Sequence, residues 1–410
     1  MRVLLYGGGA REHALAWKIK QSPMLNKLFL YDCNDGFKKL GTVLTAENID
    51  DLVKKVLEND INMVIIGPEA PLVGGFVDKF EEVGINCIGA NKKWANLEGS
   101  KSFAKDFMVR NNIPTARYKL ITDISQADDV LQEFNAPYVI KADGLASGKG
   151  VYIANSQEEA WMILSEYLSG MFGESSKKIV IEEFLEGDEV SLISLWDGRT
   201  LLPLIPARDY KRLFDNNSGP NTGGMGAYCP VNMSKQHQQS LKEYSNTLSK
   251  ALRAENADFH GIVYSGIMLT DQGVRVLEYN MRFGDPETQA IMMHMNFDLL
   301  ELFSLCVNKR LDEAILNWND GISFCLVIAA EGYPIKHKKG SLIKNAEELK
   351  TKYNVEVFYA GVKEQEGNLV SNGGRVLSIC ASGKSPAGEV YTAAELLEYE
   401  DKYYRSDIGE

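Results

Sequence analysis

Hydrophobic positions in the first part of the chain occur as short, solid runs that alternate with stretches of helical spacing. The runs predict strands at residues 2–6, 27–31, 62–66 and 85–88. The stretches between them predict helices at residues 11–21, 50–59 and 73–83. Strands that alternate with helices are typical of βαβ units and a parallel sheet, with ligand-binding loops at the carboxyl ends of the strands.

The pattern changes after a predicted helix at residues 100–111 and Pro114. Strands joined by glycine-rich turns are predicted at residues 116–121, 138–142, 151–154, 179–183 and 189–196. A loop rich in Asn, Gly and Pro (215–228) precedes a predicted helix (234–254) and a predicted hairpin (262–270 and 273–280). A strand-rich pattern restarts after Gly321, at residues 322–329, 355–360 and 375–381, and indicates a separate carboxyl-terminal unit.

The bulk composition is that of a folded protein. A chain of 410 residues is too long for one ordinary core and predicts two to four packed units. A net charge of −12 argues against a nucleic-acid partner, although a local cluster of cations can still bind an anionic substrate. No apolar run approaches the roughly 20 residues needed to cross a bilayer, and the first apolar run leads into glycines, unlike a signal peptide.

The six cysteines lie far apart, without a CxxC pair and without histidines at zinc-ligand spacing. Such cysteines are typical of reduced, mostly buried thiols. The sequence therefore predicts a cytoplasmic protein of several domains, an enzyme or a binding protein.

The segment from Val139 to Ile153 carries three glycines and two lysines between two predicted strands. Glycines let backbone N–H groups approach phosphate oxygens, and a lysine supplies a mobile positive charge. The spacing differs from a Walker A loop, because Gly144 and Gly148 are too close, Gly150 replaces Ser or Thr, and a strand follows. An ordinary hairpin loop with a solvated lysine is the alternative.

A second segment, residues 179–189, joins two apolar strands through an acidic turn. A functional interpretation has its backbone groups meet the edge of an adenine and a carboxylate meet the ribose hydroxyl groups. Acidic turns between strands are common, so a plain surface turn is the alternative.

The densest polar motif follows an apolar strand, from Gly273 to Glu287. Because alternate residues of a strand share a face, Glu278 and Asn280 project together. A carboxylate beside an amide oxygen suits Mg²⁺, which takes few protein ligands and keeps substrate phosphates as the others. Arg282 follows within reach of the same oxygens and can bind phosphate through two nitrogens. We favour a functional site over a half-exposed strand end with a surface ion pair.

The amino terminus places a glycine-rich turn, residues 7–9, between a strand and a helix start, which is a ready anion site. As a dinucleotide-binding motif it is defective because Glu12 stands where the third glycine belongs. Asp32 nevertheless ends the next strand, where a ribose-binding acid would lie, so a nicotinamide-dependent dehydrogenase stays a minor alternative. His13 is more typical of a structural histidine, and Glu69 follows a strand at the same ligand edge.

Ten motifs carry a resemblance along nearly the whole chain. In order they are GGGAREHALAWK, GPEAPLV, LEGSKSFAKDFM, IPTARY, VIKADGLASGKGV, IEEFLEGDE, SGPNTGGMGAY, EYNMRFGDPETQ, SNGGRVL and YRSDIG. Together they resemble the ATP-grasp superfamily and, within it, the phosphoribosylamine–glycine ligases (glycinamide ribonucleotide synthetases).

The resemblance implies an α/β protein whose ATP-binding part is α+β. An amino-terminal, substrate-binding domain with a parallel βαβ sheet is expected at residues 1–103. An ATP-grasp domain in two lobes is expected at residues 104–320, with the smaller lobe at 120–190. A small, β-rich carboxyl-terminal domain is expected at residues 321–410.

The resemblance also implies a reaction, in which ATP, glycine and 5-phosphoribosylamine give ADP, phosphate and N1-(5-phosphoribosyl)glycinamide, the second step of de novo purine synthesis. A carboxylate is a poor electrophile, so ATP converts glycine into glycyl phosphate, and the ribosylamine nitrogen displaces the phosphate. No enzyme nucleophile is needed. The protein supplies positioning, positive charge along the phosphates and exclusion of water. The implied cofactors are ATP and Mg²⁺ (or Mn²⁺).

The same resemblance implies the site residues. ATP contacts are expected at Lys105, Lys141, Gly144, Ser147, Gly148, Lys149, Gly150, Glu182, Glu183, Phe184, Leu185, Glu189 and Lys211. Metal ligands are expected at Glu278 and Asn280. Catalytic roles are expected for Arg282, Lys141 and Asp285, with Arg282 stabilising the transferring phosphoryl group. Asp285 and Glu287 are expected to seat glycine, and phosphoribosylamine contacts are expected at Gly9, Glu12, Glu69 and Arg375.

The chain departs from the family's usual motifs at a few positions, namely Ala10, Cys33, Asp35, Arg208 and Tyr210. The first three fall on the side where phosphoribosylamine is expected. Another ATP-grasp carboxylate–amine ligase, or a carboxylase of purine metabolism, is therefore the alternative. A nucleotide sensor without catalysis is disfavoured, because it has no need of the motif at residues 278–282. No nucleic-acid or membrane partner is expected, and the protein is expected to be a monomer or a weak homodimer.

Overall fold

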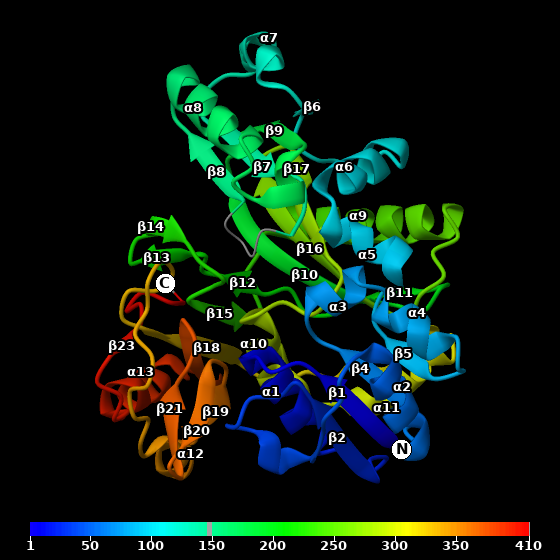
Figure 1. The fold of residues 1–410 in the computed structure, drawn as a ribbon, viewed down its shortest axis with the longest axis vertical. Helices are drawn as coiled ribbons and strands as arrows, with labels where there is room; N and C mark the ends of the chain where they lie inside the picture. Colours follow the sequence, from blue (N-terminus) through cyan, green and yellow to red (C-terminus); the bar gives the residue numbers. More distant parts are fainter. Residues whose placement is uncertain (146–149, 410) are drawn as a thin grey trace.

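The computed structural model describes residues 1–145 and 150–409 of the chain. They form an amino-terminal part, a two-lobed central part whose smaller lobe rises to the top of the view, and a carboxyl-terminal part beside both (Figure 1). None of the described helices is long and apolar enough to span a bilayer.

A parallel sheet in the order β3-β2-β1-β4-β5 forms the amino-terminal part. Its strands are β1 (Arg2–Tyr6), β2 (Lys27–Tyr31), β3 (Thr42–Leu44), β4 (Met63–Ile66) and β5 (Asn86–Ile88). The connecting helices are α1 (Ala10–Ile19), η1 (Lys38–Leu40), α2 (Ile49–Glu58), α3 (Glu69–Val73) and α4 (Phe76–Glu81). The central strands are apolar and buried on both faces, so the predicted parallel sheet is confirmed. Because β1 and β4 are neighbours, the loops after them meet at one edge.

The single helix predicted at residues 73–83 is wrong. The chain breaks between α3 and α4 because Gly75 adopts a φ of +82°, which is strained for any residue with a side chain. Two further helices, α5 (Lys92–Gly99) and α6 (Lys101–Arg110), lead into the central part, and α6 confirms the helix predicted at 100–111. Ser100 caps α6, since its side chain accepts the N–H of Phe103.

The smaller lobe of the central part is an antiparallel sheet in the order β6-β9-β7-β8. Its strands lie where the sequence predicted them: β6 (Tyr118–Ile121), β7 (Tyr138–Ala142), β8 (Val151–Ala154) and β9 (Ile179–Glu183). Its helices are η2 (Ile124–Gln126), α7 (Ala127–Gln132), α8 (Gln157–Leu168) and η3 (Gly173–Ser176). The sequence pattern did not predict α8, whose buried side chains form one core with those of the sheet.

The larger lobe is built on the antiparallel sheet β11-β10-β16-β17. Its strands are β10 (Asp188–Trp196), β11 (Leu201–Pro203), β16 (Gly261–Thr270) and β17 (Gly273–Asn280), and β16 and β17 form the predicted hairpin. The predicted helix α9 (Lys235–Ala254) packs against this sheet through an apolar stripe. Helices α10 (Glu287–His294), α11 (Leu299–Val307) and η4 (Leu311–Glu313) follow β17.

The carboxyl-terminal sheet takes strands from two parts of the chain, in the order β12-β15-β18-β22-β19. The central part supplies β12 (Arg208–Asp209) and β15 (Gly226–Cys229). The later residues supply β18 (Ile322–Ala330), β19 (Glu356–Tyr359), β22 (Arg375–Gly383) and β23 (Lys402–Tyr403). The loop predicted at residues 215–228 is therefore wrong in part. It contains β14 (Ser218–Asn221), which pairs with β13 (Arg212–Phe214), and most of β15.

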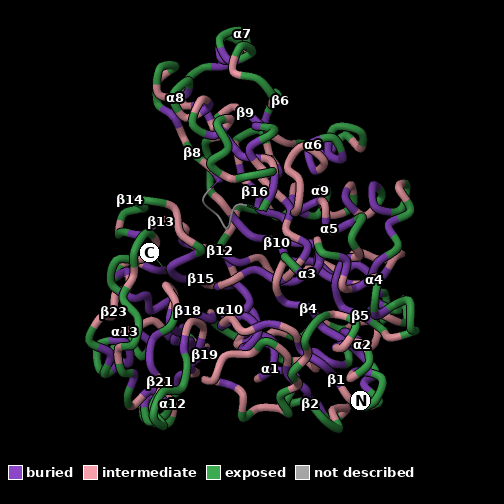
Figure 2. Tube along the Cα trace, in the orientation of Figure 1, coloured by how far each residue is buried: buried purple, intermediate pink, exposed green. Residues whose placement is uncertain are grey.

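The rest of the carboxyl-terminal part covers this sheet. The hairpin of β20 (Val362–Gln365) and β21 (Asn368–Ser371) and the helices α12 (Ala346–Tyr353) and α13 (Ala387–Leu396) complete it. Helix α10 lies at the centre of the molecule, in contact with α1, β15, β18 and β22. Figure 2 shows the buried positions gathered along these inner elements, whereas α7 and α12 lie at the exposed periphery. A buried, central α10 means that the segment just before it is held rigidly.

Candidate active site

A cavity of about 690 Å³ lies where the three parts of the molecule meet. Its wall takes residues from the loops after β1 and β4, from α5 and α6, from β7 and β9, from the end of β17 and from the carboxyl-terminal part. Most of the residues expected to bind ligands therefore come together, although they are spread over more than 300 positions of the sequence.

Two lysines and one carboxylate form a buried cationic cluster on this wall. Lys105 on α6 and Lys141 on β7 both pair with Glu182 on β9, at 3.1 and 2.9 Å. Burial lowers the pKa of Lys105 to about 8, although the negative charge of Glu182 opposes that shift. Two ammonium groups that share one carboxylate leave a net positive charge, which suits a phosphate chain.

The glycine-rich loop between β7 and β8 is anchored at its first end. Asp143 accepts hydrogen bonds from the hydroxyl groups of Ser100 and Ser102, at 3.1 and 2.6 Å. Lys101 donates to the carbonyl oxygen of Gly144 at 3.1 Å, an interaction that the sequence did not predict. Gly144 and Gly150 line the cavity.

Several expected ATP contacts are not on the cavity wall. Ser147, Gly148 and Lys149 lie outside the described residues. Glu183, Phe184 and Leu185 belong to the segment from β9 to β10 and are not among the described residues that line the cavity. Glu183 forms an ion pair with Arg117 at 2.7 Å. Their assignment to the ATP site stays a prediction.

The end of β17 carries the expected metal ligands. Glu278 and Asn280 both line the cavity, as the alternation of a strand requires. Burial raises the pKa of Glu278, but the charges of Lys211 and Lys141 outweigh burial and leave that pKa below its usual value. Lys211 lines the cavity, lies 4.0 Å from Glu278 and donates to Glu189, which is itself not among the described residues that line the cavity.

The donor set fits a magnesium ion that arrives with a nucleotide. Within residues 1–145 and 150–409, no group of three or more His, Cys, Asp or Glu side chains is placed to hold a metal ion by itself. Mg²⁺ commonly uses one or two protein oxygens together with waters and substrate phosphates. One carboxylate and one amide oxygen on β17 meet that requirement.

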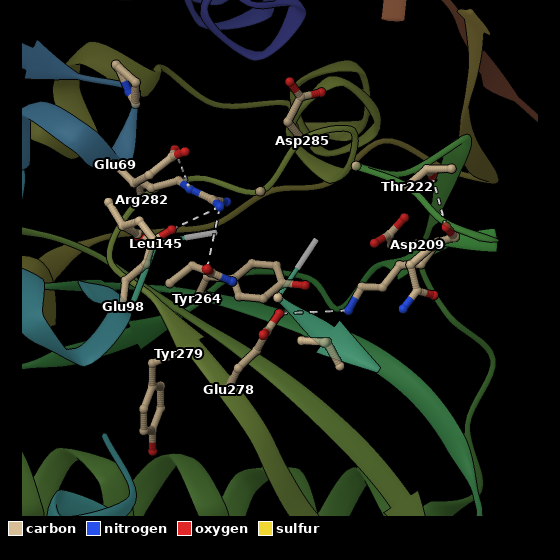
Figure 3. A pocket seen from close by; sticks show the side chains of 18 of the residues that line it. Glu69, Glu98, Leu145, Asp209, Thr222, Tyr264, Glu278, Tyr279, Arg282 and Asp285 are labelled. Atoms are coloured by element: carbon tan, nitrogen blue, oxygen red, sulfur yellow. Dashed lines mark hydrogen bonds and ion pairs between the residues drawn. The ribbon is translucent and has the colours of Figure 1, made fainter. Parts of the chain in front are cut away.

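Arg282 projects into the cavity between two acidic side chains (Figure 3). Its guanidinium lies 3.0 Å from Glu98 and 3.5 Å from Glu69. Glu98, which the sequence did not predict, is buried at the end of α5, and its second oxygen accepts the N–H of Met281 at 2.8 Å. Burial raises the pKa of Glu98, and the charge of Arg282 opposes that shift. The sequence gives little signal for it, since α5 also carries two lysines and an asparagine.

The next loop ties the central part to the carboxyl-terminal part. Asp285 pairs with Arg375 of β22 at 3.2 Å and accepts a hydrogen bond from Gln289 at 2.8 Å. Burial raises the pKa of Asp285, but the charges of Arg375 and Arg11 prevail and leave it below its usual value. Both Asp285 and Arg375 line the cavity, as expected for substrate contacts.

Gly9, Glu12 and Glu69 lie on the amino-terminal side of the cavity. Both oxygens of Glu12 already have partners, the backbone N–H of Gly9 at 2.8 Å and the guanidinium of Arg11 at 2.6 Å. A side-chain carbon on Gly67 would lie 2.0 Å from Glu12, so Glu12 packs directly against the loop after β4. Glu12 therefore holds the loop after β1 against the loop after β4, at the edge of the sheet that faces the cavity.

Family models for the three domains of phosphoribosylglycinamide synthetase match most of this chain, at residues 1–288 and 323–410. The N domain matches residues 1–98, the ATP-grasp (A) domain residues 99–288, and the C domain residues 323–410. The phosphoribosylamine–glycine ligase of Haemophilus influenzae is 44% identical over 420 residues, which cover 100% of this chain and 98% of that protein. The ligase of Brucella melitensis is 42% identical over 417 residues, which cover 100% and 97%.

Solved structures agree with these matches. The crystal structure of the phosphoribosylamine–glycine ligase of Thermotoga maritima has a TM-score of 0.83 and 35% identity, covering 99% of this chain and all of that one. The biotin carboxylase domain of the 2-oxoglutarate carboxylase of Hydrogenobacter thermophilus shares the fold, with a TM-score of 0.73 at 17% identity, covering 98% of this chain and 91% of that one. The sequence, the three domain matches and the shared architecture show that this chain belongs to the phosphoribosylglycinamide synthetase family, also called the phosphoribosylamine–glycine ligases.

Proposed function

We propose that this protein ligates glycine to 5-phosphoribosylamine at the expense of ATP, giving N1-(5-phosphoribosyl)glycinamide, ADP and phosphate. The observation that carries the proposal is the cavity itself. One space contains the lysine pair on the smaller lobe, the ligand pair on β17, the guanidinium of Arg282 and the loops of the amino-terminal sheet. Full-length relatives that carry the ligase name support the choice of substrates.

The residues divide the work of carboxylate activation. Lys105 and Lys141 neutralise the phosphates of ATP, and Glu182 holds the two ammonium groups in place. Mg²⁺ or Mn²⁺, bound by Glu278 and Asn280 with the phosphates, would supply further neutralisation of their charge. Arg282 faces the same space and stabilises negative charge as it develops on the transferred phosphoryl group. The glycyl phosphate is then attacked by the ribosylamine nitrogen, without an enzyme nucleophile.

Phosphoribosylamine is assigned to the amino-terminal side. Gly9 and Glu69 come from neighbouring loops of the parallel sheet, and Arg375 approaches from β22. Ligands commonly bind at the carboxyl ends of parallel strands, where these two loops lie. The start of α1 adds backbone N–H groups that suit a phosphate.

Four of the departures from the family motifs do not line the cavity themselves, although Ala10, Cys33 and Tyr210 each adjoin a lining residue, and this supports an unchanged acceptor. Ala10, Cys33, Asp35 and Tyr210 are not among the described residues of its wall. Asp35 instead pairs with Lys38 at 3.1 Å. Tyr210 is buried, stacks on Arg405 and accepts the N–H of Gly409. We further propose a cytoplasmic location, in keeping with six free cysteines, and a monomer or weak homodimer.

The test is ADP release by the purified protein with Mg²⁺-ATP, glycine and freshly generated 5-phosphoribosylamine, each omitted in turn. Turnover that requires all three supports the proposal. The Glu278→Ala variant, expected to fold normally and to lose turnover, controls for contaminating ATPases. ATP turnover that is indifferent to glycine and to the amine, but responds to bicarbonate, would instead favour an ATP-grasp carboxylase.

A further inference from the structure

Two carboxylates lie close together on the cavity wall, beside Gly224. Glu287 begins α10, is 2% exposed, and accepts one hydrogen bond, from the hydroxyl group of Ser191 at 2.7 Å. Asp209 on β12 has an oxygen that is sealed from solvent and has no hydrogen-bond partner among the described residues. A side-chain carbon on Gly224 would lie 2.8 Å from that oxygen and 2.4 Å from Pro286, which precedes Glu287.

Neither carboxylate has a cation of its own. The nearby cations are engaged elsewhere, since Lys211 pairs with Glu189 and Arg375 pairs with Asp285. In the part of the chain that the structure describes, no lysine, arginine or histidine forms an ion pair with Asp209 or Glu287. A buried carboxylate without a cation is costly. Burial, and next the charge of Glu287, raise the pKa of Asp209 well above its usual value.

We infer that Asp209 and Glu287 together bind the ammonium group of the amino-acid substrate. The inference rests on the proposed function and deepens it, because Asp209 has no role in that scheme and Glu287 has only a general one. An ammonium group donates three hydrogen bonds and carries the missing positive charge. A second metal ion is the less suitable occupant, since no third carboxylate, cysteine or histidine joins the pair among the described residues.

The position of the pair also sets the direction of the bound amino acid. A side-chain carbon on Gly284, two residues after Arg282, would lie 2.5 Å from a carboxylate oxygen of Glu287 and 3.0 Å from the ring of Tyr264. Glu287 therefore adjoins the segment that carries Arg282. An α-amino acid held by its ammonium group at this point directs its carboxylate toward Arg282 and the metal ligands, where phosphorylation is proposed.

The test compares glycine with glycolate, which has a hydroxyl group in place of the ammonium group. ADP release is measured for the complete wild-type protein, for Asp209→Asn and Glu287→Gln, and for Asp312→Asn, which makes the same change in an exposed ion pair with Arg199. Both cavity variants are expected to raise the KM for glycine about 10- to 100-fold and to leave the KM for ATP within about twofold. The preference for glycine over glycolate should fall by the same factor. The Asp312→Asn protein should match the wild type.

Damage to the fold would lower kcat/KM for glycine and for glycolate alike, and that result overturns the inference. A change in the Mg²⁺ concentration that the variants require, without a change in the KM for glycine, also overturns it. If Glu287→Gln does not fold, Asp209→Asn on its own decides the matter. A wild-type protein that uses another amino acid overturns the proposed substrate, yet supports the ammonium site if the variants lose that amino acid selectively. A wild type that uses glycolate as well as glycine overturns the ammonium site alone.

Discussion

Arg282 owes its position to Glu98, and this pair provides the first prediction at the scale of single residues. Glu98 holds the guanidinium with one oxygen and the backbone N–H of Met281 with the other, so it fixes both ends of a short segment. In Glu98→Gln the amide oxygen can keep the backbone contact, but the charge that orients Arg282 is lost. We expect kcat to fall about 10- to 100-fold while the KM for ATP changes little.

A double-mutant cycle shows whether Glu98 acts through Arg282. Arg282→Ala should lower kcat more than Glu98→Gln does, and the double variant should be no slower than Arg282→Ala alone. Losses that multiply in the double variant would show that Glu98 has a separate role.

Lys105 gives a prediction for the pH dependence of ATP use. Its pKa is lowered to about 8 by burial, so the free enzyme loses this positive charge as the pH rises through 8. Because kcat/KM reports the free enzyme, kcat/KM for ATP should fall above that pH. Lys105→Arg keeps its charge at high pH and should show no such decline. An alkaline decline of equal size in both proteins would assign it to another group.

The sequence predicts those site residues whose role follows from a local pattern, as the alternation of Glu278 and Asn280 along one strand shows. Glu98 and Asp209 cannot be predicted from a local pattern in this way. Their importance lies in what surrounds them, and their partners are distant in the sequence: Arg282 for Glu98, and Glu287 for Asp209. Burial of a charge is a tertiary property, and the polar neighbours of Glu98 and Asp209 in the sequence give no sign of it.

At the scale of elements, His13 joins α1 to β19. Its ring lies between Phe37 and Tyr359, and its Nδ1 accepts the N–H of Tyr359 at 2.8 Å. The structural role expected for this histidine is therefore confirmed. Burial, helped by the charge of Lys350, lowers the pKa of His13 to about 3, so the folded protein keeps the ring neutral.

This contact predicts a loss of stability in acid. Below a pH of about 6.5 the unfolded chain takes up a proton at His13 that the folded protein refuses, so the free energy of unfolding falls as the pH falls. The wild type should lose roughly 2 kcal/mol between pH 6.5 and 5 from this group alone. His13→Asn, which can still accept the N–H of Tyr359, should lose that much less in urea unfolding. Parallel losses in the two proteins would contradict the prediction.

Elements whose partners are adjacent in the chain were predicted correctly from the hydrophobic pattern. Elements that form only by pairing with distant segments were not. The hairpin of β16 and β17 was predicted because its two apolar strands are adjacent in the chain. Strand β15 was taken for part of a loop because its segment is rich in Gly, Asn and Pro. One of its partners, β18, lies about 100 residues later, and β15 is a strand because it pairs with β18 and with β12.

At the scale of the whole molecule, the carboxyl-terminal sheet argues against an autonomous central part. The boundaries expected from the sequence, at 103 and 320, stay a proposal. Strands β12 and β15 precede the second boundary, yet they hydrogen-bond into the sheet that follows it. Helix α10 also packs against β18 and β22. Removing residues 321–410 would therefore expose the edge of β15 and the apolar face of α10.

A chain that ends at residue 320 is expected to fold incompletely. It should bind an apolar dye strongly, aggregate at concentrations where the full chain does not, and show no ATP-dependent rise in melting temperature. The shortened chain lacks Arg375, which pairs with Asp285 in the loop after Arg282. Without this contact the loop that positions Arg282 in the ATP site is no longer held in place. The measurement is thermal unfolding of both chains with and without Mg²⁺-ATP, where nucleotide binding stabilises only a formed site. Equal stabilisation of the two chains by Mg²⁺-ATP would show that the central part folds alone. The carboxyl-terminal part would then contribute only to the second step, the attack of the ribosylamine nitrogen on glycyl phosphate.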